Sequence, residues 1–361
     1  MGIIACVYLF IVGISGMGHA FKLFGDDFAR KILNATASPF VGLFVGILST
    51  ALVQSSSTTT SVVVGMVAGG VLTIEGAIPI IMGANVGTTV TNTLVSLGHA
   101  NRSDEFKHAF AAATVHDFFN WITILVLFPL ELLTGFLAKL SVALTGAIQS
   151  VGGTQMGSPL KTITKPAVKL ISSAMGDQPI LVLIASLALI FFMLLFIVKL
   201  LRSLVLDKIK EFFDGHLFRN AARAMFFGLI MTFAVQSSSI TTSLVIPLAG
   251  AGVLTLRQIF PFTLGTNVGT TMTAILAALA TGEINAITVS LAHLLFNLAG
   301  IALVWPIRRI RDLPVQMAAW LADHAARNKL IPIAFVSLLF FVIPLIFVSV
   351  IGGGTGAEPV P

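Results

Sequence analysis

The stretch Gln54-Ser55-Ser56-Ser57 returns as Gln236-Ser237-Ser238-Ser239, and both copies lie inside long apolar runs. A shift of 182 residues aligns 46–91 with 228–273 without a gap, and 23 of these 46 positions are identical. The identical positions are rich in polar residues and helix breakers, including the run Asn85-Val86-Gly87-Thr88-Thr89. The chain therefore contains an internal duplication, and the duplication has retained its polar residues.

The composition indicates a polytopic membrane protein. Hydrophobic residues make up 56% of the 361 residues and charged residues 10%, against about 25% charged in soluble domains. This length allows about seven or eight crossings of ~20 residues. The net charge of +6 comes from basic residues in short loops, so we expect no nucleic-acid partner. Cys6 is the only cysteine, which excludes an internal disulfide.

Each Gln-Ser stretch interrupts its apolar run with consecutive hydroxyl residues, Ser55 to Ser61 in the first copy. Backbone that leaves the helix at membrane depth is tolerated only where protein or a water-filled cavity covers it. We therefore expect each run to form two half-length helices that meet at the Gln-Ser stretch as a re-entrant hairpin. The Asn-Val-Gly-Thr-Thr runs predict a second helix break, because Gly and Asn can unwind a turn.

The predicted fold is an all-α polytopic membrane protein with two inverted-topology repeats, each with a re-entrant hairpin and a broken transmembrane helix. Three crossings separate the hairpins, and this odd number makes the repeats face opposite sides. Basic residues number 13 in the loops 98–108, 199–224 and 306–329 and 7 in 22–31 and 139–178, which puts the N-terminus in the cytoplasm. The predicted parts are 1–138 (repeat 1: a retained first span, hairpin 39–72, broken helix 74–97, span 106–128), 139–178 (extracellular connector), 179–306 (repeat 2: a span, hairpin 225–253, broken helix 258–280, span 284–306) and 307–361 (amphipathic segment and final span).

The hairpins predict an anion site near the middle of the membrane. Interrupted helices in inverted repeats are how many transporters build such a site, and the N-terminus of a helix attracts anions. The candidate anion-binding residues are Gln54, Ser55, Ser56, Ser57, Gln236, Ser237, Ser238, Ser239, Asn85 and Asn267.

Neither motif contains Lys or Arg, so an oxyanion held there would remain uncompensated in a low dielectric. A cation must accompany it, and sodium suits the many hydroxyl, carbonyl and carboxylate oxygens. Co-binding would couple the two fluxes. The candidate sodium ligands are Thr59, Thr88, Thr89, Thr241, Thr270, Thr271, Asp117, Asn120 and Asn297.

Asp117 is an ionisable residue inside the predicted span 106–128, which marks it as a functional candidate. Its neighbour His116 and Asn120 recur in the second half as His293 and Asn297, but the position after His293 holds leucine. The carboxylate is therefore an asymmetric addition to a symmetric site. The alternative is a structural role in which Asp117 pairs with a histidine or arginine. Likewise, the Ser and Thr hydroxyls could bond to their own helix carbonyls, and the Asn-x-Gly-Thr runs could be simple kinks.

The sequence resembles the type II sodium-dependent phosphate cotransporters over residues 40–135 and 215–305. The stretches that carry the resemblance are both Gln-Ser-Ser-Ser copies, both Asn-Val-Gly-Thr runs and the run from Ala113 to Trp121. The resemblance implies sodium-driven phosphate import by a multi-pass protein of the inner or plasma membrane, with the hairpin serines in phosphate and sodium binding. It also implies that Asp117 makes transport electrogenic. The short connector indicates a bacterial member, and His99 and Arg102 depart from the Gln and Asp typical of animal relatives.

Three other functions stay open at this stage. The chain could carry another oxyanion or a dicarboxylate with sodium, or form a passive anion channel. An intramembrane serine hydrolase would use a serine with His116 and Asp117, but no Gly-x-Ser-x-Gly elbow surrounds any of these serines. We therefore expect a transporter and not an enzyme.

Overall fold

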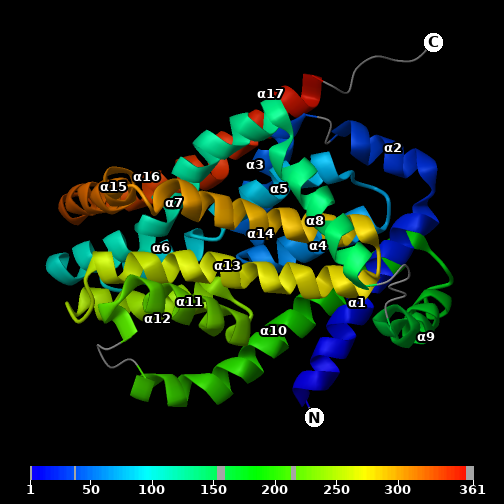
Figure 1. The fold of residues 1–361 in the computed structure, drawn as a ribbon, viewed down its shortest axis with the longest axis horizontal. Helices are drawn as coiled ribbons and strands as arrows, with labels where there is room; N and C mark the ends of the chain where they lie inside the picture. Colours follow the sequence, from blue (N-terminus) through cyan, green and yellow to red (C-terminus); the bar gives the residue numbers. More distant parts are fainter. Residues whose placement is uncertain (1, 36–37, 153–158, 213–216, 355–361) are drawn as a thin grey trace.

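The computed structural model describes residues 2–35, 38–152, 159–212 and 217–354, and all regular structure in these ranges is helical (Figure 1). Six of the described helical segments are long and apolar enough to cross a membrane, when Leu330–Val350, in which a short π-helix joins the last two α-helices, is counted as one. The helices of the first half are α1 Gly2–Phe24, α2 Asp26–Ala35, α3 Pro39–Val53, α4 Ser56–Ala68, α5 Ile74–Gly87, α6 Val90–Leu97 and α7 Ser103–Thr134. Those that follow are α8 Phe136–Gly152, α9 Pro159–Ala174, α10 Pro179–Phe212, α11 Ala221–Val235, α12 Ser238–Gly250, α13 Leu256–Thr281, α14 Ile284–Val304, α15 Arg308–Arg327, α16 Leu330–Ser337 and α17 Ile343–Gly354.

The predicted helix breaks at the two Gln-Ser stretches are confirmed. Gln54 ends α3 in the left-handed conformation (φ 57°, ψ 26°), and Ser55 returns to extended backbone (φ −152°) and caps α4. Gln236 (φ 57°, ψ 24°) and Ser237 (φ −152°) repeat this geometry between α11 and α12. We call Gln54–Ser55 the first turn and Gln236–Ser237 the second turn. Positive φ is uncommon for residues other than glycine, so two glutamines with the same positive φ indicate a geometry that the duplication preserved.

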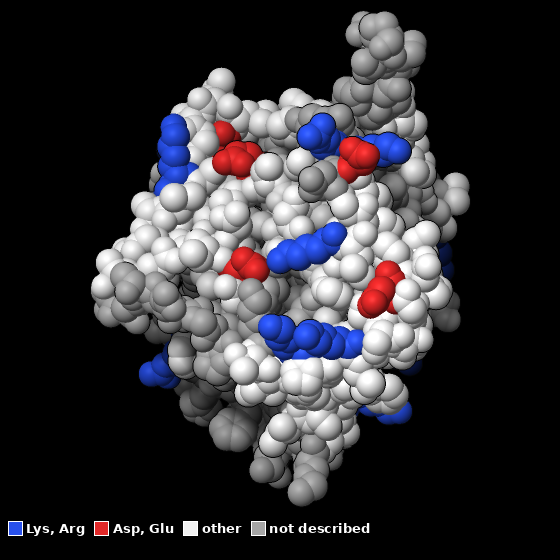
Figure 2. Space-filling view, turned by 90° about the vertical axis from the view of Figure 1, so that its right-hand side faces the viewer, with Lys and Arg blue, Asp and Glu red and all other residues white. Residues whose placement is uncertain are grey.

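The short helices of the two halves end at different places. A Cβ on Gly69, just after α4, would lie 2.9 Å from Cβ of Phe21 near the end of α1. A Cβ on Gly250, at the end of α12, would lie 3.4 Å from Nδ1 of His99, in the segment between α6 and α7. In Figure 1, α2 and α9 lie at the right-hand end of the molecule and α15 and α16 at the left-hand end. Basic and acidic side chains are interspersed on the right-hand end, as on a surface in contact with water (Figure 2).

The prediction of a broken helix at each Asn-Val-Gly-Thr-Thr run is wrong for the second copy, where α13 continues from Leu256 to Thr281. In the first copy α5 ends at Gly87, but Thr88 (φ −62°) and Thr89 (φ −84°) keep right-handed helical conformations. The glycines serve close packing instead of unwinding. A Cβ on Gly87 would lie 2.7 Å from Cβ of Thr50 on α3, and the equivalent contact of Gly269 is with α11. Small residues let membrane helices approach in this way.

Glycine at position 265 is required by the contact between α13 and α11. A Cβ there would overlap the carbonyl oxygen of Met225 and lie 2.9 Å from the amide nitrogen of Leu229. Gly265→Ala is therefore expected to force a backbone shift and to lower the free energy of unfolding by ~1–3 kcal/mol or more. Thermal unfolding in detergent measures this loss. Gly146→Ala on α8 is the matched control, because outside its own helix backbone none of the described residues has an atom within 4 Å of its Cβ position. Equal melting temperatures for the two variants would contradict the prediction.

Three helix boundaries differ from the prediction. Helix α7 continues past Pro129 to Thr134, because membrane helices tolerate proline where neighbouring groups satisfy the freed carbonyl. Helix α10 extends to Phe212, into the segment predicted as a basic loop. The connector contains the helices α8 and α9, with residues 153–158 between them outside the described residues. Glu131 near the end of α7 accepts hydrogen bonds from the amides of Leu137 (2.6 Å) and Ala138 (3.2 Å), and so caps α8.

Candidate anion site between the two turns

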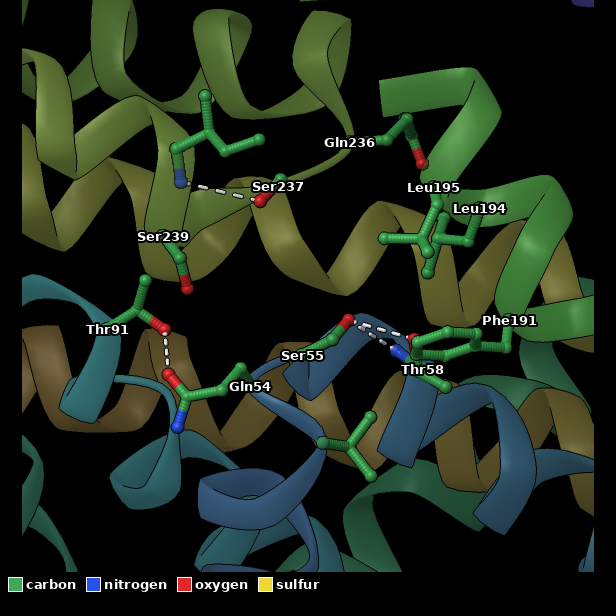
Figure 3. A pocket seen from close by; sticks show the side chains of 12 residues that line it. Gln54, Ser55, Thr58, Thr91, Phe191, Leu194, Leu195, Gln236, Ser237 and Ser239 are labelled. Carbon is green, nitrogen blue, oxygen red and sulfur yellow. Dashed lines mark hydrogen bonds between the residues drawn. The ribbon is translucent and has the colours of Figure 1, made fainter. Parts of the chain in front are cut away.

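The two turns face each other across a cavity of about 200 Å³ (Figure 3). About 10–15 Å³ suffices to hold one water molecule, so a tetrahedral oxyanion has room. Side chains of α10 close the cavity on a third side. Its principal lining residues are Gln54, Ser55 and Thr58 of the first half, Gln236, Ser237 and Ser239 of the second, and Phe191, Leu194 and Leu195 of α10.

The two halves also touch directly at the turns. Ser57 Oγ donates a hydrogen bond to the carbonyl oxygen of Gln236 (3.4 Å), and Ser239 Oγ donates to that of Thr88 (3.4 Å). Ser57 and Ser239 are equivalent positions of the duplication. Residues 179 positions apart in the chain therefore meet at one place, as the sequence predicted for the serine runs.

Each turn presents the N-terminus of a helix to the cavity. Ser55 Oγ accepts from the amide of Thr58 (3.2 Å), and Ser237 Oγ accepts from the amide of Ile240 (3.4 Å). The other first-turn amides of α4 and α12 have no intrahelical acceptor, and none of the described residues supplies one to the amides of Ser56 and Ser238. Two partial positive charges of about +0.5 each therefore converge on the cavity.

The amide groups of the two turn glutamines are bound by the protein itself. Gln54 Oε1 accepts from Thr91 Oγ1 (2.7 Å), and its Nε2 donates to the carbonyl of Ala51. Gln236 Oε1 accepts from Thr273 Oγ1 (2.8 Å) in the same way. Gln54 therefore ties the first turn to α6, and Gln236 ties the second turn to α13. The sequence pattern did not indicate this role, although Thr91 and Thr273 are the last identical pair of the duplicated stretch.

Removing the threonine hydroxyl is expected to loosen a turn without changing the size of the side chain. Thr91→Val and Thr273→Val each leave the oxygen of a half-buried glutamine without its donor, which costs ~0.5–1.5 kcal/mol. We expect a lower melting temperature and a weaker apparent affinity for the transported anion. Thr134→Val is the control, because that exposed hydroxyl bonds only to its own helix at Leu130. An affinity unchanged in both test variants would show that the turns hold their shape without these bonds.

Asn267 is the centre of a buried polar network that joins the two halves. Its Oδ1 is hydrogen-bonded to His116 Nε2, and its Nδ2 donates to Asn120 Oδ1 (2.8 Å). Asn120 Nδ2 in turn donates to the carbonyl oxygen of Asn85 (3.0 Å). His116 is therefore part of a contact between halves, and it is bonded to an asparagine instead of a serine. The serine hydrolase hypothesis gains no support from this arrangement.

The equivalent residues of the other half make the mirrored contacts. His293 Nε2 lies 3.5 Å from Asn85 Oδ1, and Asn297 Nδ2 donates to the carbonyl oxygen of Asn267 (3.3 Å). Asn85 and Asn267 are buried and do not line the cavity. Both candidates therefore lie in this network behind the turns.

Asp117 is fully buried, and neither carboxylate oxygen has a hydrogen-bond partner among the described residues. The alternative of a pair with His116 is not observed, because His116 Nε2 is bound to Asn267 and its Nδ1 has no partner in the described part of the chain. A buried carboxylate without a partner costs several kcal/mol unless a cation accompanies it. The chemistry of this position therefore suits a cation ligand.

The six candidate threonines all bond to carbonyls of their own helices, as the structural alternative predicted. The hydroxyls of Thr59, Thr88, Thr241 and Thr270 donate to Ser55 (3.2 Å), Ala84 (2.9 Å), Ser237 (2.9 Å) and Thr266 (3.0 Å), and those of Thr89 and Thr271 to Val86 (2.9 Å) and Val268 (2.7 Å). A hydroxyl that donates its hydrogen keeps lone pairs that can coordinate a cation. These bonds fix the orientation of the oxygens and leave the cation role open.

Comparison with known proteins identifies the family. The model of the family described as Na+/Pi-cotransporter matches residues 9–146 and 189–322. Sodium-dependent phosphate transport protein 2A of Ovis aries is 37% identical, with 94% of this chain and 65% of the relative aligned, and protein 2B of Homo sapiens is 33% identical, with 94% and 63% aligned. The chain thus spans less than two thirds of the length of these relatives. No solved structure matches it. The duplicated turns and the family match together show that this chain belongs to the Na+/Pi-cotransporter family.

Proposed function

We propose that this protein is a sodium-coupled symporter that imports inorganic phosphate. The observation that carries the proposal is the pair of serine-capped helix N-termini that face each other across the cavity (Figure 3). Backbone amides and hydroxyls at such N-termini bind anions. The relatives described as sodium-dependent phosphate transport proteins support phosphate as the anion and sodium as the coupling ion.

We propose that α3–α4 and α11–α12 are re-entrant hairpins of two inverted repeats, spanning 1–138 and 179–306, with 139–178 as extracellular connector. The contacts of Gly69 with Phe21 and of Gly250 with His99 support this topology, because they put the bases of the two hairpins at different sites. The basic residues favour a cytoplasmic position for the segment after α6. Transport would then proceed by alternating access in the inner or plasma membrane, and the short connector fits a bacterial member.

We assign phosphate binding to the turns and sodium binding to the oxygens around them. Ser55, Ser237 and Ser239 line the cavity and would contact the anion directly, whereas Ser56, Ser57 and Ser238 are buried, do not line it and would act through the backbone of the two helix N-termini. Gln54, Gln236, Asn85 and Asn267 would hold the turns in position. None of the described residues that line the cavity is Lys or Arg, so the anion needs a mobile counter-charge in this low-dielectric setting. Sodium held by Asp117 and by the hydroxyls and amides named above would supply it.

Uptake of labelled phosphate into proteoliposomes tests the proposed function. We expect uptake that requires an inward sodium gradient and disappears when potassium or choline replaces sodium. Competition by arsenate, sulfate and succinate tests the anion, and arsenate is expected to compete best because it shares the tetrahedral shape and charge of phosphate. Equal uptake without sodium would exclude coupling, and stronger competition by succinate would identify a dicarboxylate carrier.

A further inference from the structure

A second cavity of about 330 Å³ lies behind the second turn, between α1, α10, α11 and α13. Its walls are almost entirely apolar, with Phe10 of α1, Ile197 of α10, Phe233 of α11 and Leu276 of α13 among them. Leu276 and Phe233 are 43% and 42% exposed, so the cavity borders the surface that these spans present to lipid. A cavity with this lining suits a hydrocarbon chain.

The apolar cavity adjoins the anion cavity. Leu194 and Gln236 line both of them, so one side chain of α10 and one of the second turn form the boundary between the two spaces. The side-chain amide of Gln236 at this boundary already has hydrogen-bond partners. It is bound to Thr273 Oγ1 (2.8 Å) and to the carbonyl of Phe233 (2.5 Å). A ligand that passes this boundary therefore contacts apolar carbon atoms and polar atoms that already have hydrogen-bond partners.

We propose that the two cavities together form one site for an amphiphilic oxyanion, a phosphate or phosphonate that carries a single alkyl chain. The headgroup would bind between the two turns, and the chain would run past Leu194 into the apolar cavity. Such a compound would block phosphate transport, because it fills the space between the halves and anchors there. The placement of the headgroup between the turns rests on the proposed phosphate function. The placement of the alkyl chain depends only on the second cavity.

The affinity of the protein for such a phosphonate should depend on the length of its alkyl chain. Each methylene that leaves water contributes about a four-fold gain in binding, and the gain ends where the cavity is full. A methyl group adds a single carbon to the headgroup, whereas a butyl or octyl chain offers progressively more carbon to the apolar cavity. We therefore expect inhibition to strengthen from methylphosphonate through butylphosphonate to octylphosphonate by at least about ten-fold overall.

The test measures inhibition of sodium-driven phosphate uptake by these three phosphonates in proteoliposomes. Long chains also partition into the bilayer, so the wild type alone is not decisive. Leu276→Trp should fill the apolar cavity and abolish the advantage of octylphosphonate, while phosphate uptake and inhibition by methylphosphonate stay as in the wild type. Leu125→Trp is the matched control, since Leu125 is 69% exposed on α7 and lines neither cavity. This variant should retain the full dependence on chain length.

Two results would overturn the proposal. If the three phosphonates inhibit equally, no chain enters the second cavity, and a membrane lipid that already occupies it would give this result. If octylphosphonate inhibits better but Leu276→Trp and Leu125→Trp behave alike, the gain comes from the bilayer and not from the cavity. Both results require working phosphate uptake, so absence of sodium-driven uptake in the wild type would refute the proposed function separately.

Discussion

The substitution Ser237→Asp is expected to reduce phosphate uptake by about 100-fold or more while the folded protein stays as stable as the wild type. Ser237 caps α12 and lines the anion cavity. Aspartate caps helices as well as serine does, so the helix should keep its start. Its carboxylate would face the bound anion, and two unit charges about 4 Å apart repel by about 4 kcal/mol at an effective dielectric constant of about 20.

Two further variants at the same position separate charge from capping. Ser237→Asn keeps a capping side chain without charge and should retain most of the uptake. Ser237→Ala loses the cap, which costs ~1 kcal/mol of stability, together with one hydroxyl. Uptake of labelled phosphate and melting temperature are measured for all three. Ser173→Asp, at an exposed position of α9, controls for the added charge. Normal uptake in the Ser237→Asp protein would mean that the anion does not meet this helix N-terminus.

The turns could be located from the sequence because the duplication marks them. A glutamine followed by serines interrupts each apolar run, and serine is a favoured N-cap, so the helix ends at Gln54 and Gln236 were predictable to the residue. The hydrogen bond from Thr91 to Gln54 also joins two residues of the duplicated stretch. It was missed because an identical threonine in a membrane helix carries no sign of its partner, and 37 residues separate the two side chains.

The Asn-Val-Gly-Thr-Thr runs show where the sequence was ambiguous. Glycine in a membrane helix permits unwinding and also permits close approach of another helix. Only the position of the neighbour distinguishes these uses, and the neighbour of Gly269 is Thr232 on α11. The exchange of partners between halves, with His116 on Asn267 and His293 near Asn85, was equally hidden. The spacing of residues in one helix predicts which of them share a face. It does not predict which other helix packs on that face.

Replacing Asp117 is expected to remove most of the transport current while sodium-dependent uptake continues. The carboxylate is the asymmetric member of the site, since the second half has leucine after His293, and its oxygens have no partner among the described residues. Asp117→Gly and the isosteric Asp117→Asn both delete one fixed negative charge, and with it the reason for one extra cation to bind. Tracer flux and current recorded on the same proteoliposomes give the charge moved per phosphate, which should fall toward zero. An unchanged ratio would remove Asp117 from the coupling scheme.

Sodium should also stabilise the wild type more than the Asp117→Asn protein, and this difference does not depend on transport. A ligand at 100 times its dissociation constant stabilises the folded state by about 2.7 kcal/mol, so sodium should raise the melting temperature of the wild type. Without sodium, Asp117→Asn is expected to melt at the same temperature or higher, because it relieves an uncompensated buried charge. Asp117→Glu restores the charge and should restore part of the sodium effect. Equal sodium-induced shifts in all three proteins would contradict a cation at Asp117 and leave the carboxylate with a purely structural role.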